Sequence, residues 1–124
     1  IKKVILCSGK IYFDLLEARE SNKKDNIVFI RIEQLYPFPI KSLVKEIKNY
    51  AENAKFYWCQ EEPKNMGAWT SVRDYIQWTL NYIDANNKEI SYIGRNKAAS
   101  TATGYSKRHI AQQKKIINEI FYKL

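Results

Sequence analysis

The chain has 124 residues, 45% of them hydrophobic, which suffices for one domain with a single core between layers of secondary structure. Its 21 basic and 13 acidic side chains give a formal net charge of +8. The basic residues are scattered over every segment, as on a solvated lysine surface, and this disfavours nucleic acid as a partner. The sequence contains neither an apolar run of about 18 residues nor a signal peptide, so we expect no membrane contact.

Four short apolar runs predict β-strands. They are Lys3–Cys7, Ile27–Ile32, residues 54–60 and Ile90–Ile93. The second run is apolar at nearly every position up to Arg31, which is typical of a strand covered on both faces. The first run begins almost at Ile1, without an initiator Met, and we therefore expect residues 1–124 to be one domain of a longer chain.

Each apolar run is followed by apolar residues at helical spacing. They are Ile11, Tyr12, Leu15 and Leu16 in the first helix, Ile40, Leu43, Val44, Ile47 and Ala51 in the second, Trp69, Val72, Ile76, Leu80 and Ile83 in the third, and Ile110, Ile117, Ile120 and Phe121 in the last. The third helix is expected from Ala68 to about Ala85. Residues 21–26 are polar and predict a solvated loop, and two prolines make residues 33–39 an extended loop.

This alternation of strand and helix predicts a three-layer α/β/α sandwich with a mainly parallel sheet of four to five strands. The loops that follow the strands then emerge along the carboxyl edge of the sheet, where open α/β sheets bind ligands and partners. These loops are Ser8–Lys10, Glu33–Pro39, Gln60–Asn65 and Gly94–Gly104. We expect any function of the chain at this edge.

The stretch Trp58–Trp69 holds the most distinctive of these loops. Asn65 is expected to cap the following helix, and Gly67 to let its first turn approach a neighbouring backbone. Glu61 and Glu62 invite a general acid/base interpretation, since two carboxylates in unequal environments titrate apart. Adjacent residues on an extended backbone point to opposite sides, however, and we favour a glutamate that accepts hydrogen bonds from backbone amides or an arginine.

Four further features of the sequence bear on function. Ser8–Lys10 could hold a phosphate at a helix start, but it lacks the flanking glycines of a P-loop, and a plain helix start is the better interpretation. His109, the single histidine, forms no metal or catalytic set by spacing. Cys7 and Cys59 lie in apolar runs without CxxC spacing, which predicts buried free thiols in a reducing compartment. The small residues of Gly94–Gly104 would let another chain approach closely.

Four stretches, in order along the chain, resemble one family. They are Ser8–Leu15, Arg31–Pro39, Gln60–Trp69 and Gly94–Tyr105. Over essentially its whole length, the chain resembles the C-terminal domain of the thiamine diphosphate-dependent first component of the 2-oxoglutarate dehydrogenase complex. The resemblance implies a transketolase C-terminal-domain-like fold.

The resemblance implies an oxidoreductase of the tricarboxylic acid cycle that decarboxylates 2-oxoglutarate on thiamine diphosphate and Mg²⁺. The succinyl group then passes to a lipoyl-bearing succinyltransferase, in a complex that also contains dihydrolipoyl dehydrogenase. The resemblance further implies that the cofactors bind in other domains, so that this chain holds no catalytic, cofactor-binding or metal-binding residues and is inactive alone. It also implies a homodimer to which this domain contributes, in the cytoplasm if the source is bacterial or in the mitochondrial matrix if it is eukaryotic.

Some members of this family bind an anionic nucleotide-type effector, such as acetyl-CoA, with this domain. The matching positions are Gln34 and Lys41, which makes them the effector-binding residues that the resemblance implies. Effector-responsive members carry arginines at the position of Lys41 and at the next one, which here is Ser42. Because a lysine ammonium cannot grip a phosphate in a bidentate way, we expect a weakened or different nucleotide site.

A second class of function stays open from the sequence, namely a free-standing α/β module that binds a phosphorylated or nucleotide ligand. A thiamine diphosphate motif upstream in a longer reading frame would favour the dehydrogenase. An exposed apolar patch would favour it too, because a domain separated from its neighbours leaves uncovered surface.

Overall fold

The computed structural model describes residues 1–95 and 106–123. Their elements are β1 (Lys3–Cys7), α1 (Ile11–Asn22), β2 (Ile27–Arg31), α2 (Ile40–Ile47), β3 (Lys55–Pro63), α3 (Trp69–Tyr82), β4 (Ile90–Arg95) and α4 (Ser106–Asn118). A 3₁₀ turn, η1 (Lys48–Tyr50), prolongs α2, and a π-helical turn, η2 (Glu119–Lys123), prolongs α4. The predicted alternation of strand and helix is confirmed.

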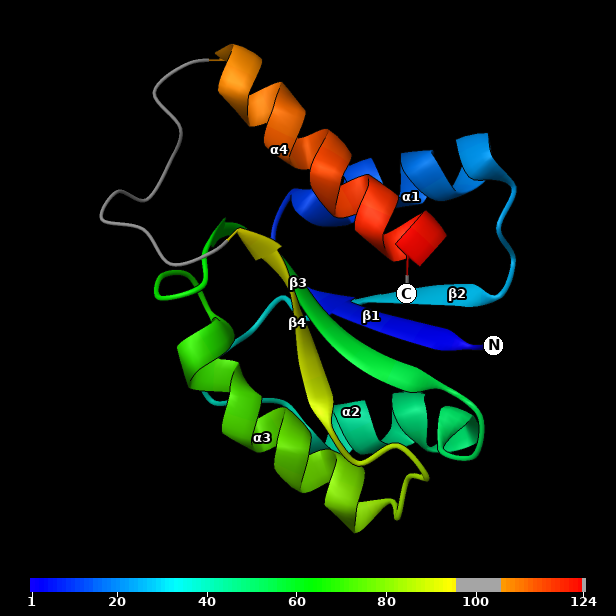
Figure 1. Cartoon of the computed structure of the whole chain (residues 1–124). Helices are drawn as coiled ribbons and strands as arrows, with labels where there is room; N and C mark the ends of the chain where they lie inside the picture. The colour runs from blue at the N-terminus through cyan, green and yellow to red at the C-terminus, as the bar shows by residue number, and fades with distance from the viewer. Residues whose placement is uncertain (96–105, 124) are drawn as a thin grey trace.

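The described strands form one parallel sheet in the order β2-β1-β3-β4. Cys7 of the central strand β1 lies opposite Arg31 of β2 and Cys59 of β3. The chain moves from β1 to one side for β2 and then to the other side for β3, so right-handed crossovers place α1 and α2 on opposite faces. Figure 1 shows α1 and α4 over one face and α2 and α3 over the other, which confirms the predicted three-layer sandwich.

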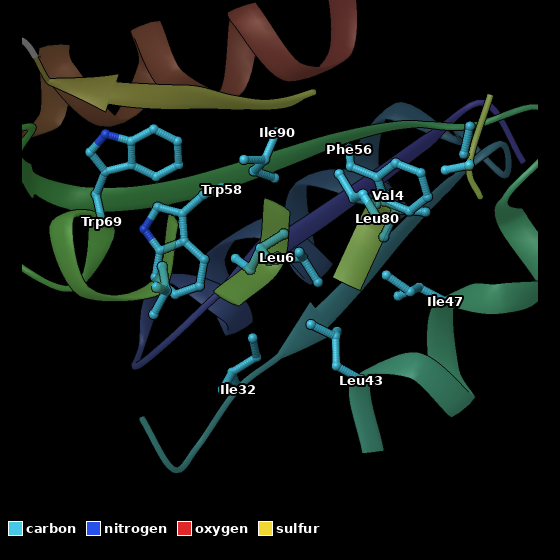
Figure 2. Close-up of a cluster of buried hydrophobic side chains, with 14 residues drawn as sticks. Val4, Leu6, Ile32, Leu43, Ile47, Phe56, Trp58, Trp69, Leu80 and Ile90 are labelled. Atoms are coloured by element: carbon cyan, nitrogen blue, oxygen red, sulfur yellow. The ribbon is translucent and has the colours of Figure 1, made fainter. Parts of the chain in front are cut away.

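The side chains of β1 and β3 alternate between two cores. Val4, Leu6, Phe56 and Trp58 pack against α2 and α3, as Figure 2 shows. Ile5, Cys7, Tyr57 and Cys59 pack against α1 and α4. Strands with apolar residues on both faces are typical of a parallel sheet covered by helices. Both cysteines are buried free thiols, as predicted.

Strand β2 packs against both cores, as predicted, but it is covered less completely on the face of Val28 and Ile30: Ile27 and Phe29 are buried against α1 and α4, and Ile30 packs against the core under α2 and α3. Val28 and Ile30 are only half-buried, because β2 is an edge strand of the described sheet. Two smaller differences concern element ends. Helix α1 continues to Asn22, into the predicted loop 21–26, and β4 continues to Arg95. No described helix is both long and apolar enough to cross a membrane.

The predicted inward face of the last helix is partly wrong. Ile110 is 54% exposed, whereas Ile116, which the prediction omitted, is 3% exposed. Ile120 and Phe121 are buried as expected. At about 100° per residue, a position six residues before Ile116 points well away from the face that Ile116 and Ile120 share. Ile110 therefore lies on the solvent side of α4.

The transition from β3 to α3 also differs from its prediction. Strand β3 does not end at residue 60 but continues to Pro63, with a register shift against β4 between Gln60 and Pro63. The N-cap residue of α3 is Ala68, not Asn65, and no side chain of the cap residue forms a capping hydrogen bond. The first turn of α3 is instead stabilised from the sheet, by Gln60.

Candidate functional site

From β1 the chain continues to β2 on one side of the sheet and then to β3 on the other side, so a topological switch point lies between β1 and β3. The carboxyl ends of these two neighbouring strands open into a pocket of about 660 Å³. Its walls include Ser8, Tyr36, Trp58, Glu62, Ser71 and Tyr75. We call this pocket the switch-point crevice. Residues from the loops after β1, β2 and β3 all line it, so the predicted meeting of these three loops at one edge is confirmed. The loop Gly94–Gly104 lies mostly outside the described residues.

Gln60 organises the floor of the switch-point crevice. Its side chain is 3% exposed. The Oε1 atom accepts hydrogen bonds from the Trp58 indole Nε1 at 2.9 Å and from the Trp69 backbone N–H at 3.0 Å. The Nε2 atom donates to the backbone carbonyls of Glu62, Pro63 and Met66 at 3.2, 2.9 and 2.7 Å. One amide thus satisfies a buried indole, caps α3 and fixes the turn that follows β3.

Two glycines allow close packing around this amide. Gly67 has φ +67°, and a Cβ there would lie 3.1 Å from Gln60 Oε1 and from Glu62 Oε2. The close approach predicted for Gly67 is therefore present, although its neighbours are side chains rather than backbone. Gly94 has φ +154°, and a Cβ there would lie 2.6 Å from the carbonyl oxygen of Gln60. Both positions demand glycine.

Tyr92 closes the network on the β4 side. Its hydroxyl donates its one hydrogen mainly to the carbonyl oxygen of Arg95 at 2.7 Å, and the carbonyl oxygen of Glu62 shares that hydrogen at 3.3 Å. Burial raises the pKa of Tyr92 to about 12, so the phenol stays protonated and keeps its role as a donor throughout the neutral range.

The structure separates the two adjacent glutamates. Glu62 lines the switch-point crevice, whereas Glu61 is not among its lining residues. The two carboxylates therefore do not converge on one point in the crevice, as expected for neighbours on an extended backbone. This geometry does not support a paired acid/base mechanism.

The predicted effector residues lie beside the crevice rather than in it. Gln34 is exposed, and its Nε2 donates to the carbonyl oxygen of Pro37 at 3.3 Å. Lys41 is exposed in the first turn of α2. Neither residue lines the switch-point crevice. The loop between them, which contains a cis Tyr36–Pro37 peptide bond, contributes Tyr36 to the crevice wall.

The phosphate interpretation of Ser8–Lys10 finds no support in the structure. Ser8 lines the switch-point crevice, but Lys10 lines a different hollow together with Asp14 and Glu17 of α1. The described residues include no group of three or more His, Cys, Asp or Glu side chains that could hold a metal ion. His109 belongs to α4, but its side chain lies outside the described part of the chain.

A second hollow, of about 880 Å³, runs along the edge of β4 between α3 and α4, and sequence reasoning missed it. Its charged lining residues are Lys64, Arg73, Asp74, Glu89, Lys115 and Glu119. Gln77 accepts a hydrogen bond from the Ile90 N–H at 3.2 Å and donates to the Lys88 carbonyl, so its side chain pairs with backbone at this edge. Because three basic and three acidic side chains line the hollow, it favours neither an anion nor a cation.

The sequence alone assigned no role to Gln60, and it did not indicate Ser71 or Tyr75 as residues of the site. A polar residue directly after the apolar run Phe56–Cys59 is the available signal for Gln60, since buried amides at strand ends need hydrogen-bond partners. Ser71 and Tyr75 belong to the outward part of an amphipathic helix. Their place at the crevice depends on how α3 packs, which no local pattern reveals.

The sequence of the chain is similar to those of known proteins. A family model described as 2-oxoglutarate dehydrogenase C-terminal matches residues 1–121. The 2-oxoglutarate dehydrogenase E1 components of Brucella anthropi, Brucella ovis and Brucella canis are each 50% identical to the chain over 112 residues. These 112 residues are 90% of this chain but 11% of each relative. A de novo designed Rossmann fold protein is 18% identical, with a TM-score of 0.44 over 96% of each chain.

The parallel sheet, its two helical layers and the crevice at the reversal of strand order define a Rossmann-like α/β domain. Within that class, the chain belongs to the 2-oxoglutarate dehydrogenase C-terminal family.

Proposed function

We propose that the chain is the C-terminal domain of an E1 component that decarboxylates 2-oxoglutarate and passes the succinyl group to the lipoyl group of a succinyltransferase. The observation that carries this proposal is the 50% identity over 112 residues to E1 components, within a family match from residue 1 to 121. The chain corresponds to 11% of the length of those relatives. Catalysis and assembly with dihydrolipoyl dehydrogenase therefore belong, in this proposal, to the longer protein.

The described residues do not fit the cofactors of this reaction, thiamine diphosphate and Mg²⁺. No cluster of His, Cys, Asp or Glu among them could hold a metal ion, and no basic side chain lines the switch-point crevice to pair with a diphosphate. We therefore place the cofactors in other domains of the enzyme and assign no catalytic step to this chain. The same lack of cations in the crevice argues against a free-standing module for phosphorylated ligands.

A contribution of this domain to the E1 dimer is supported by the outer face of α3. Tyr75, Trp78 and Tyr82 recur at helical spacing and are 43%, 50% and 66% exposed. The Trp78 and Tyr82 rings stack at 5.1 Å, and Tyr75 stacks on Phe38 at the same distance. Neighbouring exposed aromatic side chains of this kind mark protein contacts. We propose that this face packs against other parts of the E1 dimer.

A nucleotide effector near Gln34 and Lys41 is a separate part of the proposal. Lys41 is an exposed cation at the start of α2, where a phosphate gains from the helix dipole, but Ser42 beside it adds no second cation. We expect weak binding of acetyl-CoA or AMP by the full-length enzyme. Calorimetry would show this binding, and Lys41→Ala should abolish it. Unchanged affinity in that variant would rule out the site.

A domain exchange tests the proposed function directly. The C-terminal region of the Brucella anthropi E1 component that matches this chain would be replaced by residues 1–121, and 2-oxoglutarate-dependent ferricyanide reduction would be measured with thiamine diphosphate and Mg²⁺. We expect the chimera to be active, and the E1 component truncated before this region to be inactive. Turnover by the truncated enzyme, or by the isolated chain, would contradict the proposed role.

A further inference from the structure

The switch-point crevice has a charge opposite to that of the chain as a whole. Although the chain carries a formal net charge of +8, Glu62 is the only charged side chain among the described residues that line the crevice. The nearest lysine in sequence, Lys64, extends its Nζ over the ring of Tyr92 at 5.4 Å. Within the described part of the chain, no basic side chain forms an ion pair with Glu62. The crevice therefore offers a ligand one carboxylate and no cation, which favours a positively charged group over a phosphate.

The other walls of the crevice suit a flat cation. Tyr36 is 91% exposed at the rim. Tyr75 is 43% exposed and is held parallel to Phe38, with ring centroids 5.1 Å apart and an interplanar angle of 8°. Trp58 lies at the buried end, where its indole N–H is already bonded to Gln60. Aromatic faces attract cations, and a guanidinium stacks on them better than an ammonium does.

The backbone of Glu62 is anchored, and its carboxylate lies close to the tight turn at Gly67. The Glu62 backbone carbonyl accepts hydrogen bonds from Gln60 Nε2 at 3.2 Å and from the Tyr92 hydroxyl at 3.3 Å. The side-chain Oε2 packs so closely over Gly67 that a Cβ there would lie 3.1 Å from it. A carboxylate beside this tight turn, in a crevice that aromatic side chains also line, can accept two parallel N–H bonds from one guanidinium.

We propose that the switch-point crevice binds an arginine side chain of a polypeptide, with its guanidinium paired to Glu62 and stacked on tyrosine. The polypeptide source follows from the position of Tyr75, which belongs both to the crevice and to the exposed aromatic face of α3 formed with Trp78 and Tyr82. A chain that inserts an arginine into the crevice also covers this face. The inference is independent of the effector site at Gln34 and Lys41.

The test uses the 124-residue chain labelled with ¹⁵N and titrated with the tripeptide amide acetyl-Gly-Arg-Gly-NH₂. We expect saturable shifts of the Trp58 indole and Gly67 amide signals, with a dissociation constant on the order of 1 mM. The same peptide with citrulline, which is uncharged, should bind about tenfold more weakly, and the lysine peptide should also bind more weakly. Equal binding of the citrulline or lysine peptide would overturn the proposal.

Variants locate the site. Glu62→Gln keeps the shape of the side chain and should weaken binding of the arginine peptide about tenfold. The control is Glu46→Gln, at an exposed position of α2, which should leave the affinity for the peptide unchanged. Tyr36→Ala should also weaken binding of the arginine peptide. Tyr82 lies outside the crevice, so Tyr82→Ala should leave the affinity for this short peptide unchanged. An unchanged affinity in Glu62→Gln would refute the assignment. Free arginine amide that binds as tightly as the peptide would refute the polypeptide source.

Discussion

The Oε1 atom of Gln60 accepts the backbone N–H of Trp69 at 3.0 Å, so a side chain of β3 caps the first turn of α3. The two residues are nine positions apart, and the turn between them carries Glu62 and Gly67. This bond ties the end of a central strand to the start of a helix on one face of the sheet. It therefore sets the width of the switch-point crevice and the position of its carboxylate.

Gln60→Ala should lower the free energy of unfolding by about 3 kcal/mol. The substitution leaves the Trp58 indole N–H and the Trp69 amide without their acceptor in the interior, and a buried donor without a partner costs about 1–3 kcal/mol. Urea unfolding at pH 7 measures the change. Gln34→Ala is the matched control, because Gln34 is exposed and its hydrogen bond to the Pro37 carbonyl is 3.3 Å long. Similar losses in both variants would show that the buried network adds no stability.

Gly94→Ala should destabilise the chain by about 2–3 kcal/mol. The new Cβ would lie 2.6 Å from the Gln60 carbonyl oxygen and 2.7 Å from the Tyr92 hydroxyl, so strand β4 must move away from β3. Gly9→Ala is the control, since Gly9 also has a positive φ, of +82°, but has no atom within 4 Å of the new Cβ. Its cost should be only about 1 kcal/mol. If thermal unfolding shows equal losses, backbone conformation rather than close packing explains the glycine at position 94.

The sequence was sufficient to predict the layers, the parallel sheet and the common edge of three loops. These follow from local patterns, namely apolar runs and helical spacing, combined with the handedness of crossovers. The edge position of β2 could not be predicted, because strand order depends on contacts between distant segments. The cap at Asn65 was predicted wrongly for a related reason: the acceptor for the first turn of α3 comes from Gln60, on another element.

Alkaline pH should destabilise the chain from about pH 9 upward. Burial raises the pKa of Cys7 from 9.0 to about 12, and burial and then the neighbouring Cys7 raise the pKa of Cys59. Burial raises the pKa of Tyr92 from 10.0 to about 12. The folded chain thus keeps protons that the unfolded chain releases, so the free energy of unfolding falls as pH rises towards 12, by up to about 1.4 kcal/mol per pH unit for each group.

Urea unfolding at pH 8, 9, 10 and 11 measures this slope. The double substitution Cys7→Ala and Cys59→Ala should make it shallower, whereas Tyr82→Phe, at a tyrosine 66% exposed, should not change it. Thiol-specific reagents should likewise leave both cysteines unmodified at pH 8 until the chain unfolds. Rapid modification of the folded chain would mean that the thiols are accessible and that their pKa values are not raised by burial.

The two isoleucines Ile110 and Ile116 should differ sharply in their response to truncation. Ile116 is 3% exposed and packs in the core between α1 and the sheet. Ile116→Ala should lower the free energy of unfolding by about 3 kcal/mol, because it removes buried methyl groups and leaves a cavity. Ile110 is 54% exposed, and Ile110→Ala should change stability by less than about 0.5 kcal/mol. The pair forms its own control, since both side chains are isoleucine on the same helix. Equal costs in urea unfolding would show that α4 is rotated relative to its position in the structure.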